Sequence, residues 1–195
     1  MKKLICLVLV LLCFASVAAA ESVPSKTTAD MVTVTEIKTG TGVVASNLVI
    51  APVTSAAVDT EAVETCSREI EKLVASASVV EYFGEVKDSE GNEVKIVELL
   101  NSENVTVNEF VPLVVDNYSA AYGNVTVSFT FSTPYEADKP VLVLVGITNP
   151  TTGEIEWVAL EGVGTGVDGG ISVEFTPEIL EAIQNGTAMM AVVSE

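Results

Sequence analysis

The chain has 195 residues, of which 49% are hydrophobic. It contains nine basic and 27 acidic residues, which gives a formal net charge of −18. Such a chain lacks the clustered lysines and arginines that phosphate groups attract, so we expect no nucleic-acid partner. The sequence also contains no histidine. This excludes serine or cysteine nucleophiles activated by imidazole, imidazole acid–base catalysis and histidine-ligated metals.

Residues 1–20 have the pattern of a secretory signal peptide. Lys2 and Lys3 precede an apolar run, and the small residues that end at Ala20 match an A-x-A cleavage site. The apolar run is too short to span a bilayer comfortably. We therefore expect a secreted, extracellular protein cleaved near Ala20, with no membrane partner afterwards. Lipoprotein processing at Cys13 and an uncleaved anchor are the alternatives.

Cleavage would leave seven basic residues and a formal charge of −20, because two lysines and no acidic residue lie before the cleavage site. It would also leave Cys66 as the one thiol, which excludes an internal disulfide. A chain of this size can bury about 70% of its extended surface and fold on its core alone. Residues 21–30 are polar and without periodicity, and they predict a flexible leader.

The first regular segments are predicted to be two strands. Met31–Ile37 alternates valine and threonine, and Asn47–Val53 is a second apolar stretch. A turn at Gly40 and Gly42 separates them.

One long amphipathic helix is predicted over about residues 60–77, capped by Asp59 or Thr60. Cys66 lies on its apolar face with no base beside it, so we expect a buried, unreactive thiol; an intermolecular disulfide is the alternative. The helix should pack on the sheet through apolar residues at helical spacing: Val63, Cys66, Ile70, Leu73, Val74 and Ala77.

The next segment is predicted to be a hairpin. Strands over Val79–Val86 and Glu93–Leu99 flank a polar turn at Asp88–Asn92. Oxygen-bearing side chains alternate in this turn, as at the start of an EF-hand loop. Glu93 stands at the sixth position in place of glycine, however, and Leu99 at the twelfth in place of glutamate. A turn is therefore favoured over a calcium site, and no metal-binding residue is assigned.

The remainder of the chain is predicted to be mostly strands, with one short helix over about 177–185. Thr176 caps this helix, Pro177 occupies its first position, and its apolar residues should seal one end of the core. The predicted strands are Val105–Val107, Val111–Val115, Val125–Phe131, Val141–Ile147, Ile155–Leu160, Ile171–Phe175 and Ala188–Val193.

A dinucleotide-like spacing, G-x-G-x-x-G, occurs at residues 164–169. A cofactor loop of this kind must follow a strand and open a helix. Here the predicted strand Ile171–Phe175 follows instead, so the glycines predict a turn between two strands. No cofactor is expected.

Two loop tyrosines, Tyr118 and Tyr122, are the candidate ligand-binding residues. Aromatic rings exposed at the rim of a β-sandwich can stack on sugar rings, whereas Trp157 alternates with apolar neighbours and is predicted to lie in the core. No catalytic residue is assigned, because the abundant carboxylates follow no local motif. Four N-x-[ST] sequons occur and are interpreted as incidental: Asn104, Asn117, Asn124 and Asn185.

Together these elements predict an α+β fold that is mostly β, an antiparallel β-sandwich with two helices. Residues 31–110 and 111–195 form two subdomains or one continuous core. The order of Asn124–Phe131, Pro140–Val145, Trp157 and the G-G-I-S-V-E-F strand at 169–175 resembles the Ig-like β-sandwich modules of secreted or surface proteins of Gram-positive bacteria. The resemblance implies spacer or adhesive roles.

We therefore predict a secreted, non-enzymatic binding or interaction module of the bacterial exterior, with a glycan or a protein as its ligand. One alternative is a carboxylate-based, glycosidase-like hydrolase, which requires a cleft with two carboxyl groups roughly 5–9.5 Å apart. The other is a structural or adhesive unit that assembles through an exposed sheet edge. The sequence leaves the oligomeric state open.

Overall fold

The structure, a computed structural model, describes most of the chain after residue 31. The predicted signal peptide and leader lie outside the described residues. The described ranges are 32–53, 59–131, 135, 140–165 and 169–195.

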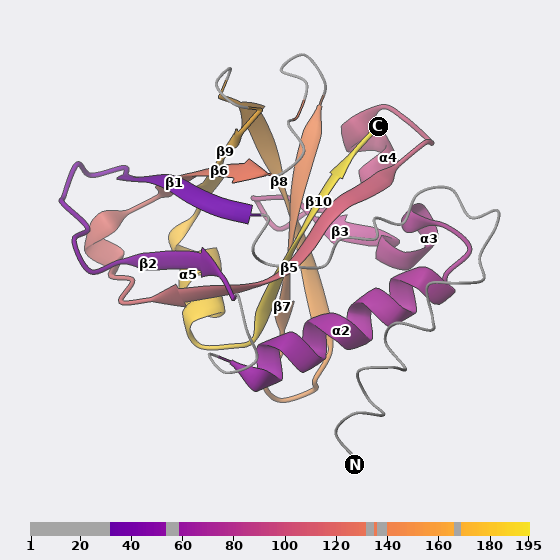
Figure 1. Cartoon of the computed structure of the whole chain (residues 1–195), viewed down its shortest axis with the longest axis horizontal. Coiled ribbons are helices and arrows are strands. Elements are labelled where there is room, and N and C mark those ends of the chain that lie inside the picture. Colours follow the sequence, from indigo (N-terminus) through magenta and orange to yellow (C-terminus); the bar gives the residue numbers. More distant parts are fainter. Residues whose placement is uncertain (1–31, 54–58, 132–134, 136–139, 166–168) are drawn as a thin grey trace, which may run out of the picture.

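The ten strands of these described ranges belong to one sheet whose main path runs β1-β6-β9-β8-β7-β10-β5-β2, with β3 and β4 attached beside β8. The strands are β1 (Val32–Thr39), β2 (Val49–Pro52), β3 (Glu85–Lys87), β4 (Glu93–Lys95), β5 (Thr106–Asp116), β6 (Val125–Phe131), β7 (Val141–Thr148), β8 (Ile155–Gly164), β9 (Ile171–Phe175) and β10 (Ala188–Ser194). The sheet coils until its end strands, β1 and β2, come into contact, so the molecule is nearly a barrel (Figure 1).

The prediction of a mostly β, antiparallel fold is confirmed. Every pairing is antiparallel except a single parallel bridge between Lys87 and Val158. The two-sheet, Ig-like form is not confirmed, because the described strands are joined by hydrogen bonds into one continuous sheet. The boundary proposed between residues 110 and 111 falls inside β5, and strands from both sides of it pair with each other.

The helices are α2 (Thr60–Ala75), α3 (Val79–Phe83), α4 (Ile96–Leu100), α5 (Pro177–Gln184) and the 3₁₀ turn η2 (Ala120–Tyr122). The two helices predicted from the sequence are confirmed. Asp59 caps α2 by accepting a hydrogen bond from the backbone N–H of Ala62 at 3.0 Å. Thr176 caps α5, and Pro177 opens it.

The predicted buried stripe of α2 is wrong at its C-terminal end. Val74 is 53% exposed and Ala77 lies beyond the helix, which ends at Ala75. Packing against β5 and β10 instead buries the turns that carry Cys66 and Leu73, together with two polar residues of the same face. The buried residues of α2 are Ala62, Thr65, Cys66, Glu69 and Leu73.

The strand predicted over Val79–Val86 is wrong in its first half, which forms α3. The Ser78 side chain accepts a hydrogen bond from the N–H of Glu81 at 3.0 Å and starts the helix. Gly84, with a φ of 58°, ends it before the short strand β3.

The strand predicted over Glu93–Leu99 is likewise only half correct. β4 covers its first three residues, and α4 follows directly from Ile96. Asn101 ends α4 in the left-handed conformation, with a φ of 52°. Ile96 and Leu100 lie one turn apart and are both buried, which favours the helix.

Two predicted strands, Val105–Val107 and Val111–Val115, form the single strand β5. Between them, Asn108 and Glu109 interrupt the apolar pattern. In the structure the interruption is a bulge, since Val192 lies opposite Glu109 and the next residue of β10 lies opposite Val107. The skipped Asn108 donates its side-chain N–H to the hydroxyl of Ser194 at 2.8 Å.

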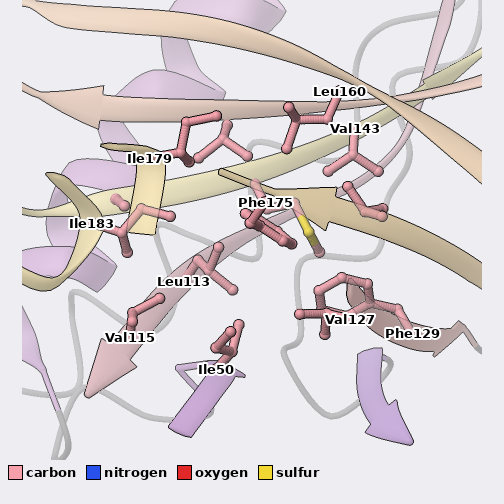
Figure 2. Close-up of a cluster of buried hydrophobic side chains, with 14 of the residues drawn as sticks. Ile50, Leu113, Val115, Val127, Phe129, Val143, Leu160, Phe175, Ile179 and Ile183 are labelled. Carbon is pink, nitrogen blue, oxygen red and sulfur yellow. The ribbon is translucent and has the colours of Figure 1, made fainter. Parts of the chain in front are cut away.

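The coiled sheet buries apolar side chains on both of its faces. The inner core fills the inside of the coil with residues of most strands and of α5, among them Ile50, Leu113, Val127, Phe129, Val143, Leu160, Phe175, Ile179 and Ile183 (Figure 2). The outer core lies between the sheet and α2, α3 and α4, and includes Cys66, Leu73, Phe83, Ile96, Phe110, Trp157, Met189 and Ala191. Ile179, Leu180 and Ile183 of α5 belong to the inner core, as predicted.

Candidate interaction surface

Tyr118 and Tyr122 lie in the connection between β5 and β6, at one end of the barrel. Their rings meet edge to face, with centroids 6.2 Å apart. Tyr118 is only 8% exposed. Its hydroxyl donates to the carbonyl of Gly123 at 3.2 Å, and its backbone N–H donates to the side chain of Gln184 on α5 at 2.6 Å. The expectation of an exposed ring is therefore wrong for Tyr118, which instead joins this connection to α5.

Burial raises the pKa of Tyr118, and the charges of Glu181 and Glu178 raise it further. Tyr122 is half-buried, and one side of it packs against the inner core. Of the two predicted residues, Tyr122 is the one with a substantial part of its side chain at the surface.

The loop between β1 and β2 is hydrogen-bonded to the connection between β5 and β6. The N–H of Gly40 donates to the carbonyl of Asn124 at 2.7 Å, and the hydroxyl of Thr41 donates to the carbonyl of Ala121 at 2.9 Å. A Cβ atom at Gly40 would lie 3.1 Å from the Asn124 carbonyl oxygen, so a side chain there would crowd this contact. Within the loop, the Thr39 hydroxyl donates to the carbonyl of Val43 at 2.6 Å.

This loop carries exposed valines that the sequence analysis missed. Val43 is 46% exposed, Val44 is 84% exposed, and Val49 at the start of β2 is 41% exposed. Three of the five large hydrophobic residues with high exposure in the described part of the chain thus lie in one ten-residue stretch. Contiguous exposed apolar residues are typical of interaction sites. The one sequence signal was a valine pair between glycine and polar residues, outside any alternating pattern.

We call residues 40–49 and 116–124 together the barrel-end surface. Figure 1 shows the β1–β2 loop at the left end of the molecule, on the opposite side from α3 and α4. The side chain of Asn117 donates to the carbonyl of Asn47 at 3.1 Å and so ties the end of the loop to the start of the connection. The surface is therefore held by hydrogen bonds at several points along both of its segments.

Exposed carboxylates border the barrel-end surface. Asp116 lies opposite Val49 in the β2–β5 pair, and Glu174 accepts a hydrogen bond from the Asn124 side chain at 2.9 Å. Glu178 and Glu181 are exposed on α5, whose Gln184 is bonded to Tyr118 of the connection, and we call these four carboxylates the acidic rim. The nearby basic residue Lys38 is bonded to Glu36 of the same strand at 2.7 Å.

The two buried carboxylates of the described residues do not face each other. Glu69 lies on α2, where it accepts hydrogen bonds from Lys72 at 2.6 Å and from the Tyr82 hydroxyl at 2.8 Å. Glu109 lies opposite the inner-core residue Val192, and its charge raises the pKa of Tyr135, although burial of that phenol is the larger cause. One carboxylate therefore belongs to the outer face of the sheet and the other to the inner face.

Residues 166–168 of the glycine motif lie outside the described residues, and the residues described on either side of them belong to a pair of antiparallel strands, as predicted. β8 and β9 pair antiparallel on either side of it, and no helix follows β9 until Pro177. The N–H of Thr165 donates to the carbonyl of Gly170 at 2.9 Å, and Gly169 has a φ of 61°. The described residues that follow the motif therefore form a strand and not the helix start on which a pyrophosphate would rest.

The polar segment at Asp88–Asn92 also forms the predicted turn, between β3 and β4. Both carboxylate oxygens of Asp88 accept hydrogen bonds within the turn, from the backbone of Glu90 and from the backbone and side chain of Asn92. The Asn92 side chain is the main cause that lowers the pKa of Asp88. The carboxylate therefore organises the turn itself.

Trp157 and Cys66 are both buried, as predicted. The Trp157 ring meets Phe83 and Phe110 edge to face, with centroids 4.9 Å and 5.7 Å apart. Cys66 is 3% exposed, and burial raises its pKa from 9.0 to about 12, with a smaller contribution from the charge of Glu69. A thiol of this kind is protonated at neutral pH and weakly nucleophilic.

Within the described ranges, no three carboxylate or thiol side chains are grouped as metal ligands. None of the described helices is long and apolar enough to cross a membrane. Comparison of this chain with protein-family models, with curated proteins and with solved structures found no match.

Proposed function

We propose that the protein is a secreted, non-enzymatic interaction module of the bacterial exterior that contacts its partner through the barrel-end surface. The observation that carries this proposal is the exposure of Val43, Val44 and Val49 within one stretch of chain whose residues Gly40 and Thr41 are hydrogen-bonded to the connection that carries Tyr122. Exposure of valine side chains to water is unfavourable, and burying them against a partner would release that free energy. Their concentration in the barrel-end surface therefore favours a contact there. A loop already held in place loses little entropy on binding.

The inner core supports a surface role over an internal site. In the described part of the chain, apolar side chains from β2, β5, β6, β7, β8, β9 and α5 converge inside the coil (Figure 2). The resemblance to Ig-like surface modules is part of the proposal, and it rests on β6, β7, β8 and β9. In modules of this kind, binding through end loops that a rigid sheet positions is a common arrangement.

A structural unit that assembles through sheet edges is less favoured. The two end strands of the main path, β1 and β2, face each other, and β2 has only four residues. β1 has a bulge between Val34 and Glu36, and it carries the Glu36–Lys38 ion pair. Bulges, charges and short strands all oppose pairing with another chain.

The test compares binding of the wild type and two surface variants, Tyr122→Ala and the double variant Val43→Ser/Val44→Ser. A glycan array and the extracellular proteins of the producing bacterium are screened with each. We expect the double variant to lose most of any specific binding, and Tyr122→Ala to lose part of it. The control, Val74→Ser/Val163→Ser, removes two exposed valines outside this surface and should bind as the wild type does. Specific binding that survives both surface variants would place the contact elsewhere.

A further inference from the structure

We propose that the barrel-end surface takes a cationic protein segment, in which apolar side chains cover the valines and flanking lysines or arginines meet the acidic rim. This inference rests on the proposed function and names the chemistry of the partner. Its basis is the combination of two exposed valines, Val43 and Val44, with four exposed carboxylates that lie on or next to the segments of this surface. Asp116 is paired with Val49, and Glu174 is bonded to Asn124. Glu178 and Glu181 lie on α5, whose Gln184 is bonded to Tyr118.

The carboxylates of the rim are available to a partner. Among the ion pairs of the described residues, none involves Asp116, Glu174, Glu178 or Glu181. Glu174 accepts a hydrogen bond from the neutral amide of Asn124, and that bond leaves its charge unneutralised. Unpaired negative charges around an apolar patch raise the association rate of a positive partner and disfavour a negative one.

The same charges disfavour the other possible occupants. A second copy of this chain would bring its own net charge of −18 and an identical acidic rim. Anionic lipid surfaces and nucleic acids are repelled for the same reason. A protein segment that carries both apolar side chains and positive charges is the occupant that the valines and the acidic rim together attract.

A neutral glycan fits the surface less well than a peptide does. Sugar rings stack on exposed aromatic faces, but the Tyr118 ring is buried and one side of Tyr122 packs against the inner core. The exposed large hydrophobic side chains here are aliphatic, and Val44 is the most exposed of them at 84%. Branched aliphatic side chains pack well against leucine or valine side chains of a peptide.

The experiment is an NMR titration of the secreted protein, as it remains after signal-peptide cleavage and labelled with ¹⁵N, with three synthetic peptides of equal length and equal leucine content. They differ in their remaining residues, which are lysine, serine or glutamate. We expect the leucine–lysine peptide to shift resonances within residues 40–49 and 116–124, the leucine–serine peptide to bind roughly tenfold more weakly, and the leucine–glutamate peptide not to bind. The affinity should fall as NaCl rises from about 10 to about 500 mM.

Two variants that each lose three negative charges distinguish the effect of the acidic rim from the effect of the overall charge. Glu174→Gln/Glu178→Gln/Glu181→Gln should weaken binding of the lysine peptide roughly tenfold. Glu85→Gln/Glu93→Gln/Glu98→Gln removes three exposed carboxylates on β3, β4 and α4 and should change the affinity less than twofold. Val43→Ser/Val44→Ser should abolish the localised shifts. Melting temperatures of all variants verify that they fold.

Other outcomes overturn the inference in distinguishable ways. Equal binding of the lysine and serine peptides at this surface, with no effect of the rim variant, would reject a cationic partner and leave the interaction surface in place. A glycan that shifts Tyr122 while no peptide binds would change the class of partner. If the lysine peptide shifts resonances over the whole molecule, and both charge variants reduce these shifts equally, the peptide is attracted nonspecifically by the net charge. If no probe binds and no surface variant alters capture in the screen described above, both proposals fail.

Discussion

At the scale of single residues, Gly146 of β7 is required by the close approach of Trp157. A Cβ atom at this position would lie 2.8 Å from two carbons of the indole ring. Cβ atoms in proteins essentially never lie within 3.0 Å of another heavy atom in this way. The ring is held from other sides by Phe83 and Phe110 and has little room to move. We expect Gly146→Ala to destabilise the fold by about 1–3 kcal/mol, measured by urea unfolding.

A double-mutant cycle tests the cause of that loss. Trp157→Phe alone costs stability because it leaves a cavity, but its smaller ring makes room for the new methyl group. The combined variant Gly146→Ala/Trp157→Phe should therefore lose less stability than the sum of the two single losses. Strict additivity would indicate that the ring is not the obstacle.

Cys66 should be unreactive in the folded protein. Because burial raises its pKa to about 12, almost no thiolate exists at pH 8, and the thiol is 3% exposed. Alkylation by iodoacetamide at pH 8 should be at least about tenfold slower in buffer than in urea, where the thiol is free. Rapid labelling of the folded protein, or a disulfide-linked dimer on a non-reducing gel, would contradict this.

The same pKa shift gives a pH dependence of stability. The unfolded thiol releases its proton above about pH 9, whereas the folded one holds it until about pH 12. The folded state therefore binds more protons in this window, so stability should fall by up to about 1.4 kcal/mol per pH unit from this group. Cys66→Ala should show a shallower decline than the wild type between pH 9 and pH 11, in urea unfolding at each pH. Equal slopes would mean that the thiol titrates alike in both states.

At the scale of elements, the helix termini were the best predicted features because their signals are local. Asp59 and Thr176 each accept a bond from an N–H three residues later, and these signals stand in the sequence itself. The same kind of signal was present at Ser78, but the valines at positions 79 and 80 favoured a strand. A helix of five residues carries too little periodicity to overcome that preference.

The candidate surface was half predicted for a related reason. Tyr122 was identified by its place in a loop, but Tyr118 is buried in the inner core, and its backbone is bonded to Gln184, which lies 66 residues away in the sequence. Exposure of Val43 and Val44 likewise depends on the docking of the loop against Ala121 and Asn124. Neither contact can be inferred from spacing along the chain.

The cap of α2 gives a prediction at this scale. Asp59→Ala removes the acceptor for the Ala62 N–H and a negative charge at the helix start, and should cost about 0.5–2 kcal/mol in urea unfolding. Asp59→Asn keeps an acceptor and should retain most of that stability. An alanine variant as stable as the wild type would show that the contacts of α2 with β5 fix the helix start without its cap.

At the scale of the whole molecule, the sheet unites both halves of the chain. β1 pairs with β6, β2 pairs with β5, and β5 spans the boundary between residues 110 and 111. The strands β5, β7, β8 and β10 carry inner-core residues on one face and outer-core residues on the other, so neither core can form alone. These connections favour one continuous core over two subdomains.

We therefore expect the protein to unfold in a single cooperative transition. Far-UV circular dichroism reports the whole sheet, and the fluorescence of Trp157 reports the outer core, so both should give the same midpoint in urea. A fragment of residues 111–195 should lack stable structure, because it loses β1, β2, the first part of β5 and the helices that cover the outer face. Two separated transitions, or a folded fragment, would instead show that residues 111–195 form an independent unit, as the Ig-like resemblance implies, with the N-terminal strands and helices added to it.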